Sequence, residues 1–186
     1  MRRIYFITAL FLLSILCLHG QEAEATAGQG STVRLKAIDP YNYVAVEMKG
    51  SYDLHEQAFG TLYEQGGVQG IALTDYPMGI YYNSPEETPV DSLTWEIGMR
   101  VAGVENVKTP LTLKTFAFET LASMIFEGSF GDEMQMAYGQ VYQWIAQNGY
   151  QAAGPLVEIF MTMPTENEQG EYIGQVEIQV PVRKAE

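Results

Sequence analysis

The sequence predicts an α+β fold: duplicated β-α-β-β modules with pseudo-twofold symmetry, antiparallel sheets with helices packed on them, and a cleft between the modules. The first observation behind this prediction is an internal repeat. Residues 50–52 (Gly-Ser-Tyr) precede residues 58–64 (AFGTLYE), and residues 128–130 (Gly-Ser-Phe) precede residues 137–143 (AYGQVYQ). The other two observations are strand-like alternation in several short segments and a helical segment with terminating residues in each copy.

Module one covers about residues 33–107. In chain order we expect a strand, a helix and two strands, over residues 43–48, 54–65, 78–82 and 93–101. Gly66 and Gly67 are expected to end the helix, because glycine is the residue most often found just after a helix.

Module two covers about residues 108–186, and its helix carries the clearest signal. The module begins with a strand over residues 121–126 and ends with strands over residues 156–163 and 172–182. Between them, Asp132 is a natural N-cap, and Asn148-Gly149 is a natural helix end. Apolar residues recur at helical spacing at positions 134, 137, 138, 141, 144 and 145, which predicts one buried helix face.

Charge and composition exclude several classes of protein. The 186 residues carry 10 Lys plus Arg against 23 Asp plus Glu, a formal net charge of -13. Such a charge repels phosphate backbones, so we expect no nucleic-acid partner. With 47% hydrophobic and 12% aromatic residues, the chain is too apolar for a disordered acidic tail.

The N-terminal residues predict export. Two arginines precede an apolar run over residues 4–18, which is too short to span a bilayer and is typical of a secretory signal peptide. We therefore expect a signal peptide over residues 1–20, a flexible leader over 21–32 and a periplasmic or extracellular mature chain with no stable membrane span. Cleavage there removes Cys17, the one cysteine of the sequence, and with it thiolate chemistry and cysteine-ligated zinc.

Three strands each place an isolated glutamate opposite an aliphatic face: Glu96, Glu158 and Glu177. One interpretation puts these carboxylates on the water side of an antiparallel sheet. The other is a cleft between the modules, lined by aromatic rings and holding a carboxylate that receives a cation. Phe160 shares the face of Glu158 by alternation and favours the second interpretation. Further rings available to such a cleft are those of Tyr82, Phe130, Tyr138 and Tyr142.

Three segments together resemble the GyrI-like small-molecule-binding domains, a family that includes the DNA gyrase inhibitor protein and the effector-binding domains of multidrug-responsive regulators. These segments are residues 81–98 (YYNSPEETPV…LTWEIG), 154–160 (GPLVEIF) and 176–182 (VEIQVPV). The resemblance covers about residues 33–184. It implies a pseudo-twofold pair of β-α-β-β modules, in agreement with the repeat.

The resemblance also implies a ligand site. In effector-binding members, an acidic residue on the strand matching Glu158 lies among aromatic rings and receives lipophilic cations. By position, Phe160, Glu177 and Phe130 would line the same cavity, with Tyr82 and Glu96 as their counterparts in module one. No DNA-binding region precedes the domain, and export would separate the chain from a cytoplasmic gyrase, so the regulator and inhibitor roles are not expected.

The function expected is therefore an exported protein that binds a small amphipathic molecule, cationic or aromatic, without a metal or cofactor. The alternative is hydrolysis of a reactive electrophile, with Glu158 as general base and Tyr82 as hydrogen-bond donor. A tetrapyrrole role, which the fold of haem-binding SOUL proteins suggests, would depend on His55, since His19 leaves with the signal peptide. His55 is expected to be a solvated helix residue instead.

Overall fold

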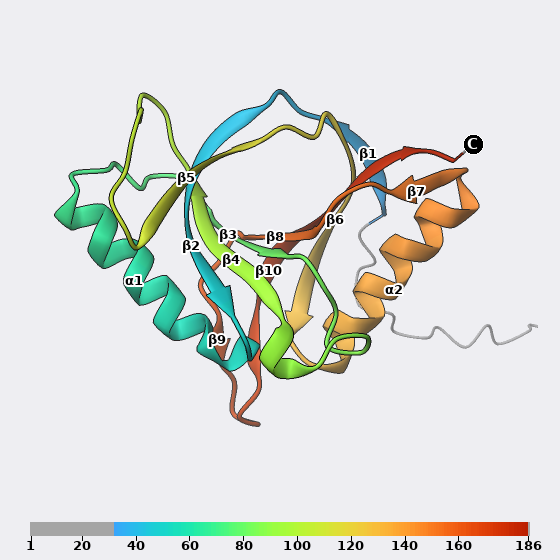
Figure 1. The fold of residues 1–186 in the computed structure, drawn as a ribbon. Helices are drawn as coiled ribbons and strands as arrows, with labels where there is room; N and C mark the ends of the chain where they lie inside the picture. Colours follow the sequence, from blue (N-terminus) through green and yellow to red (C-terminus); the bar gives the residue numbers. More distant parts are fainter. Residues whose placement is uncertain (1–31, 186) are drawn as a thin grey trace, which may run out of the picture.

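The structure is a computed structural model that describes residues 32–185, and these residues form one ten-stranded antiparallel sheet and two α-helices (Figure 1). The signal peptide expected over residues 1–20 and almost all of the leader lie outside the described residues. The strands follow the order β1-β6-β10-β8-β3-β4-β2-β5, and the short strands β7 and β9 also pair with β10. The large antiparallel sheet with two helices agrees with the predicted class.

The elements run in chain order as follows: β1 (Arg34–Ala37), β2 (Tyr41–Lys49), η1 (Tyr52–Leu54), α1 (His55–Val68), β3 (Pro77–Tyr81), η2 (Val90–Ser92), β4 (Thr94–Arg100), β5 (Leu111–Phe116), β6 (Thr120–Ser129), α2 (Asp132–Gln147), β7 (Tyr150–Ala152), β8 (Leu156–Phe160), β9 (Thr165–Glu166) and β10 (Tyr172–Lys184). The strands expected from alternation are all present, within a few residues of their predicted ends.

Helix α1 does not end at Gly66-Gly67 but runs to Val68. Gly66 is buried, and a Cβ atom at this position would overlap the side chain of Leu73. This glycine therefore allows close packing inside a helix and does not stop it.

Helix α2 matches its prediction more closely. Its buried residues are Met134, Ala137, Val141 and Ile145, all on the predicted apolar face. Gly149 follows the helix with φ +73°, as expected of a glycine at a helix end. The N-cap is Gly131, however, and Asp132 lies in the first turn, where a carboxylate still stabilises the helix N-terminus.

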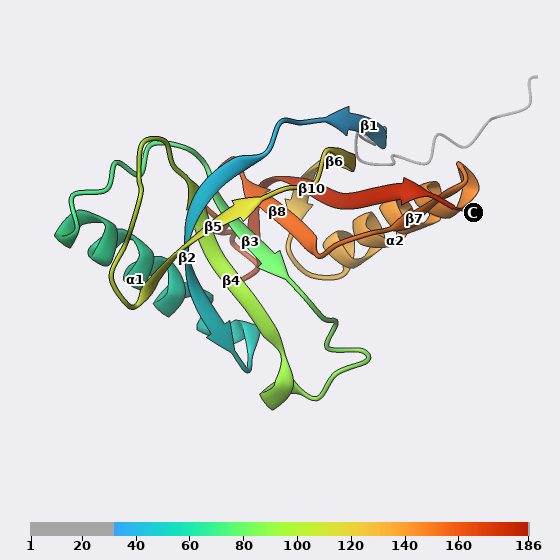
Figure 2. The same ribbon diagram turned by 45° about the horizontal axis from the view of Figure 1, so that its top comes forward.

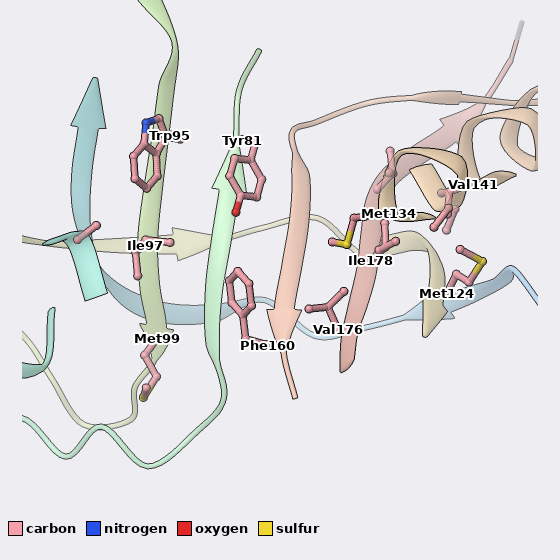
Figure 3. Packing of buried hydrophobic residues seen from close by; sticks show 14 of the residues in the cluster. Tyr81, Trp95, Ile97, Met99, Met124, Met134, Val141, Phe160, Val176 and Ile178 are labelled. Carbon is pink, nitrogen blue, oxygen red and sulfur yellow. The ribbon is translucent and has the colours of Figure 1, made fainter. Parts of the chain in front are cut away.

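Both helices cover the same face of the sheet, which we call the helix face. Its core combines Leu62 of α1 and Val141 of α2 with Ile97 of β4 and Ile178 of β10. Figure 3 shows this core, with side chains from the central strands and from α2 directed toward one side of the sheet.

The opposite face of the sheet is covered as well. The connection from β1 to β2 and the connection from β5 to β6 cross between the two ends of the sheet side by side, joined by a hydrogen bond from Ile38 N to Glu119 O (Figures 1 and 2). A second core lies beneath them and includes Tyr43, Met78 and Val157. Both faces of the central strands are therefore buried.

Among residues 32–185, no helix has the length and apolar character that crossing a membrane requires.

Candidate functional site

Glu158 lies at the middle of the sheet, on the helix face. It belongs to β8, where it pairs with Gly79 of β3 on one side and Ile178 of β10 on the other. Only 5% of the residue is exposed. A carboxylate in this position has lost its water, so every hydrogen bond it receives must come from the protein.

Two tyrosines supply the hydrogen bonds to Glu158. Tyr81 donates from its hydroxyl to Oε2 at 3.1 Å, and Tyr138 of α2 donates to Oε1. Burial raises the pKa of Glu158 to about 7, although the two tyrosine hydrogen bonds act in the opposite direction. Burial also raises the pKa of both tyrosines, with the charge of Glu158 adding to the shift, so both remain donors at neutral pH.

Gly79 provides the space for the contact between Tyr81 and Glu158. The ring of Tyr81 lies back along β3, and a Cβ atom at position 79 would stand 2.7 Å from Tyr81 Cζ. Figure 3 shows the Tyr81 hydroxyl directed along the strand toward Phe160 of the neighbouring β8. A glycine inside a strand thus marks a close approach, here by a side chain two residues along the same strand.

Tyr81 has a second polar neighbour, His55 at the start of α1. His55 Nε2 lies 2.9 Å from the Tyr81 hydroxyl oxygen, and His55 Nδ1 contacts the backbone carbonyl of Tyr52. The Tyr52 hydroxyl in turn donates to the carbonyl of Asn83 at 2.7 Å. A continuous chain of polar contacts therefore runs from Glu158 through Tyr81 and His55 to the backbone.

Aromatic rings surround this chain. The His55 ring lies 4.5 Å from that of Trp95, and the Tyr52 ring makes edge contacts with Tyr81 and Trp95. Phe59 of α1 meets Phe160 of β8 edge to face at 5.3 Å. Rings in such arrangements offer their faces and edges to a ligand with apolar or cationic groups.

The structure brings together four of the residues predicted for the site. Glu158 and Phe160 are alternate residues of β8 on the helix face, and Phe130 and Tyr138 pack against the same core. Of these, only Tyr138 touches the Glu158 carboxylate through a hydrogen bond. The burial of Glu158 and of Glu96 contradicts the interpretation that these glutamates lie on a solvated face.

Glu96, Tyr82 and Glu177 lie on the opposite face of the sheet. Glu96 accepts hydrogen bonds from Tyr82 at 2.6 Å and from Tyr43, and pairs with Lys114. This corrects the expectation that these residues line one cavity with Glu158. It also separates Glu158 from Tyr82, the two residues of the alternative catalytic pair.

Glu177 has its own cation. It pairs with Lys36 at 2.8 Å and accepts a hydrogen bond from Ser123 at 2.6 Å. Burial alone would raise the pKa of Glu177, but the bonds from Lys36 and Ser123 outweigh it and hold that pKa below its usual value. Its helix-face neighbour along β10 is Ile178, which pairs with Glu158, so strand register puts Glu177 on the other side.

The sequence interpretation missed His55, Tyr81 and Tyr52 as members of the site. His55 is half-buried and bonded, not solvated, because η1 places the start of α1 over β3 and β4. One available signal was Gly79, an isolated glycine in a predicted strand two residues before Tyr81.

Two surface hollows, of about 450 Å³ and 310 Å³, lie elsewhere. The larger is lined by residues 69–72 and 102–106, and the smaller by residues around the N-terminus of α2. Neither includes Glu158, which is 5% exposed because neighbouring side chains close over its carboxylate. Within the described residues, no three His, Cys, Asp or Glu side chains gather in a metal-binding group.

Comparison with known proteins identifies relatives of this fold. The family model described as the GyrI-like small molecule binding domain matches residues 31–183. No curated protein shows significant sequence similarity to the chain.

Solved structures of three proteins show the same fold at low identity. EcmrR in its complex with DNA is 20% identical with a TM-score of 0.68, over 83% of this chain and 58% of EcmrR, so this chain spans well under two thirds of that protein. It covers 99% of the separate EcmrR C-terminal domain (18%, TM-score 0.69). A hydrolase from Listeria innocua is 14% identical with a TM-score of 0.62, over 82% of this chain and 92% of the hydrolase. SAV2435 bound to tetraphenylphosphonium is 12% identical with a TM-score of 0.55, over 82% of this chain and 94% of SAV2435.

Proposed function

The chain belongs to the family of GyrI-like small-molecule-binding domains, and we propose that it binds a small amphipathic molecule, cationic or aromatic, at Glu158. The observation that carries this proposal is a buried carboxylate that lacks a protein cation. Within residues 32–185, the ion pairs involve Glu47, Glu96 and Glu177, whereas Glu158 is bonded only by two tyrosine hydroxyls.

The physical chemistry of such a site favours a cation. A desolvated carboxylate gains most from a positive charge that arrives without its own strongly held water, as a lipophilic cation does. Ring faces around it add about 0.5 to 2 kcal/mol of cation–π attraction. Glu96 and Glu177, which already carry Lys114 and Lys36, have no comparable need.

The relatives support the ligand class. SAV2435 binds tetraphenylphosphonium, a lipophilic cation, and shares the fold of this chain. We extend this ligand class to the present protein as part of the proposal, and use tetraphenylphosphonium as its probe.

Entry of a ligand requires a local rearrangement. Since Glu158 is 5% exposed and Tyr138 bonds to it from α2, the ligand must displace the Tyr138 hydroxyl or shift the first turns of that helix. We propose that Tyr138 and Phe160 move aside to admit the ligand. Tyr81 stays in place beneath them, because Gly79 leaves room for its ring and His55 bonds to its hydroxyl.

We further propose that the domain is a duplicated β-α-β-β unit and that it is exported. The duplication is supported by the strand order, which reads β1-β6-β10-β8 from one end and β5-β2-β4-β3 from the other. The pairs Lys36–Glu177 and Lys114–Glu96 occupy corresponding places in these two runs. Export rests on residues 1–20, and the N-terminal sequence of the mature protein tests it.

The proposed function is tested by titrating the protein with tetraphenylphosphonium in a calorimeter at pH 8. Glu158→Gln should weaken binding by more than tenfold, or about 1.4 kcal/mol, because the amide keeps the shape but not the charge. Glu127→Gln is the control, since Glu127 is exposed and its substitution changes net charge equally. Equal affinity of Glu158→Gln and the wild type would refute the proposal.

A further inference from the structure

Tyr81 faces two acceptors with one hydroxyl proton. Its oxygen lies 3.1 Å from Glu158 Oε2 and 2.9 Å from His55 Nε2. A tyrosine hydroxyl donates one hydrogen bond, so it can satisfy one of these neighbours as donor and must accept from the other or leave it unpaired.

The tautomer and charge of His55 decide whether Tyr81 donates a hydrogen bond to Nε2 or accepts one from it. The Tyr52 carbonyl can only accept, so the contact with it places a hydrogen on His55 Nδ1. Burial lowers the pKa of His55, outweighing the hydrogen bond to Tyr52 and the charge of Asp53, which raise it. The ring is therefore neutral, and Nε2 presents a lone pair to Tyr81.

We propose that His55 is a positioning residue that competes with Glu158 for the Tyr81 proton and thereby favours the protonated form of Glu158, from which a bound cation displaces the proton. With Glu158 protonated, every contact is filled: the carboxyl donates to Tyr81, Tyr81 to His55 Nε2, and His55 Nδ1 to Tyr52. With Glu158 ionised, either His55 or the carboxylate loses its hydrogen bond from Tyr81.

The other groups around the chain do not supply a competing charge. Glu158 faces Tyr138 from α2 and Tyr81 from β3, with the phenol of Tyr52 farther off in η1. His55 faces Tyr52, Tyr81 and the rings of Phe59 and Trp95, and the negative charge that raises its pKa is that of Asp53 in η1. Both phenols that touch Glu158 have raised pKa values and stay neutral with it.

The consequence of this inference for ligand binding rests on the proposed function. When a monocation binds, the carboxyl O–H bond of Glu158 breaks, the proton leaves to the solvent or buffer, and Tyr81 turns its own proton to the carboxylate. The site thus exchanges one proton for one cation, and His55 sets the pH at which this exchange occurs.

The first experiment needs no ligand, which separates it from a test of the proposed function. The side-chain carboxyl of Glu158 is titrated by ¹³C NMR in the wild type, His55→Asn, Tyr81→Phe and the double variant, with Glu158→Gln assigning the resonance. Asparagine retains a donor for the Tyr52 carbonyl but has no counterpart of Nε2. His55→Gln is the second variant, because its amide can donate to Tyr81.

His55→Asn and His55→Gln should each lower the pKa of Glu158 by about 0.5 unit or more, since Tyr81 then donates to the carboxylate without competition. Tyr81→Phe should raise that pKa and abolish the effect of His55→Asn. An unchanged Glu158 pKa in both His55 variants would show that His55 has only a structural role, and a raised Glu158 pKa would show that His55 is a cation in the wild type. Either result overturns the inference, as does a full His55→Asn effect in the Tyr81→Phe background.

The second experiment counts protons released on tetraphenylphosphonium binding, by calorimetry at pH 6 in buffers of different ionisation enthalpy. We expect close to one proton per cation in the wild type and fewer in His55→Asn. Equal release in both would overturn the inference. Failure of any protein to bind the probe would refute the proposed function and leave the NMR result to decide the role of His55.

Discussion

At the scale of single residues, Glu158 makes the folded protein sensitive to pH. Its pKa is 4.5 in the ordinary state and about 7 after burial. Between these values the folded protein keeps a proton that the unfolded chain has lost, so the contribution of Glu158 to stability is fully present below pH 4.5 and is lost as pH rises through about 7. The ionised carboxylate therefore destabilises the ligand-free protein, and a bound cation offsets this destabilisation.

We predict that Glu158→Gln removes this dependence. The free energy of unfolding of the wild type, relative to that of the variant, should fall by about 3 kcal/mol between pH 4.5 and pH 8. Urea denaturation at several pH values measures the difference and cancels the contribution of groups such as Glu177, whose lowered pKa acts in the opposite direction. Parallel pH profiles for the two proteins would show that Glu158 titrates normally.

A second prediction concerns Gly79. In Gly79→Ala the new Cβ atom pushes the Tyr81 ring from its place and separates its hydroxyl from Glu158 and His55. We expect a loss of about 2 kcal/mol of stability by overpacking, and loss of tetraphenylphosphonium binding.

Gly60→Ala is the matched control for thermal unfolding, because a Cβ at position 60 of α1 meets nothing within 4 Å. That substitution should be neutral or stabilising, as alanine is the better helix former. If Gly79→Ala melts and binds like Gly60→Ala, the close approach of Tyr81 has no energetic weight.

At the scale of elements, the sequence predicted where strands lie better than which way they face. In both β8 and β10, alternation places the glutamate on one face of the strand and the aliphatic residues on the other. The aliphatic residues of β8 lie on the face away from the helices, whereas those of β10 lie on the helix face, so Glu158 and Glu177 lie on different faces of the sheet. Because both faces are buried, alternation alone does not distinguish them. The register with distant strands does, and it is not encoded locally.

The same reasoning explains what was found and what was missed at the site. Glu158 stood out because a charged residue interrupts an apolar strand, a signal that a single segment carries. Strand β5 was not predicted, because three of its six residues, Thr112, Lys114 and Thr115, are polar and weaken the strand signal. His55 was misjudged because its partner, Tyr81, belongs to a strand that only tertiary packing brings to it.

The edge strands β1 and β5 supply the lysines of the opposite face, and we predict unequal effects of removing them. Lys114→Met leaves Glu96, which is 2% exposed, without its ammonium and should cost about 2 to 3 kcal/mol. Lys36 is more exposed, and Glu177 keeps Ser123, so Lys36→Met should cost under about 1 kcal/mol.

Urea denaturation at pH 7 measures both effects. The double variant Glu96→Gln/Lys114→Met serves as control and should recover part of the loss, because no buried charge is left unpaired. Equal costs for the two lysine substitutions would show that burial does not govern these pairs.

At the scale of the whole molecule, the two halves of the sequence exchange their outer strands. Strand β1, at the start of the first half, pairs with β6 of the second half, and β5 of the second half pairs with β2 of the first. The halves also meet at the centre through β3 and β8, the strands that carry Tyr81 and Glu158. The polar chain at the site therefore crosses from one half to the other.

This arrangement predicts that residues 33–107 and residues 108–186 do not fold when produced separately. Each piece would lack the outer partner of one strand and expose the central edge of β3 or β8, and a few strands with one helix bury too little apolar surface to compensate. Produced together, the pieces should associate, because the same pairings re-form between them. Circular dichroism and thermal unfolding of each piece, and co-purification of the pair, measure this. A single piece with a cooperative unfolding transition would show that one module is a stable unit, and Glu158 would then lie at an interface between two domains and not within one core.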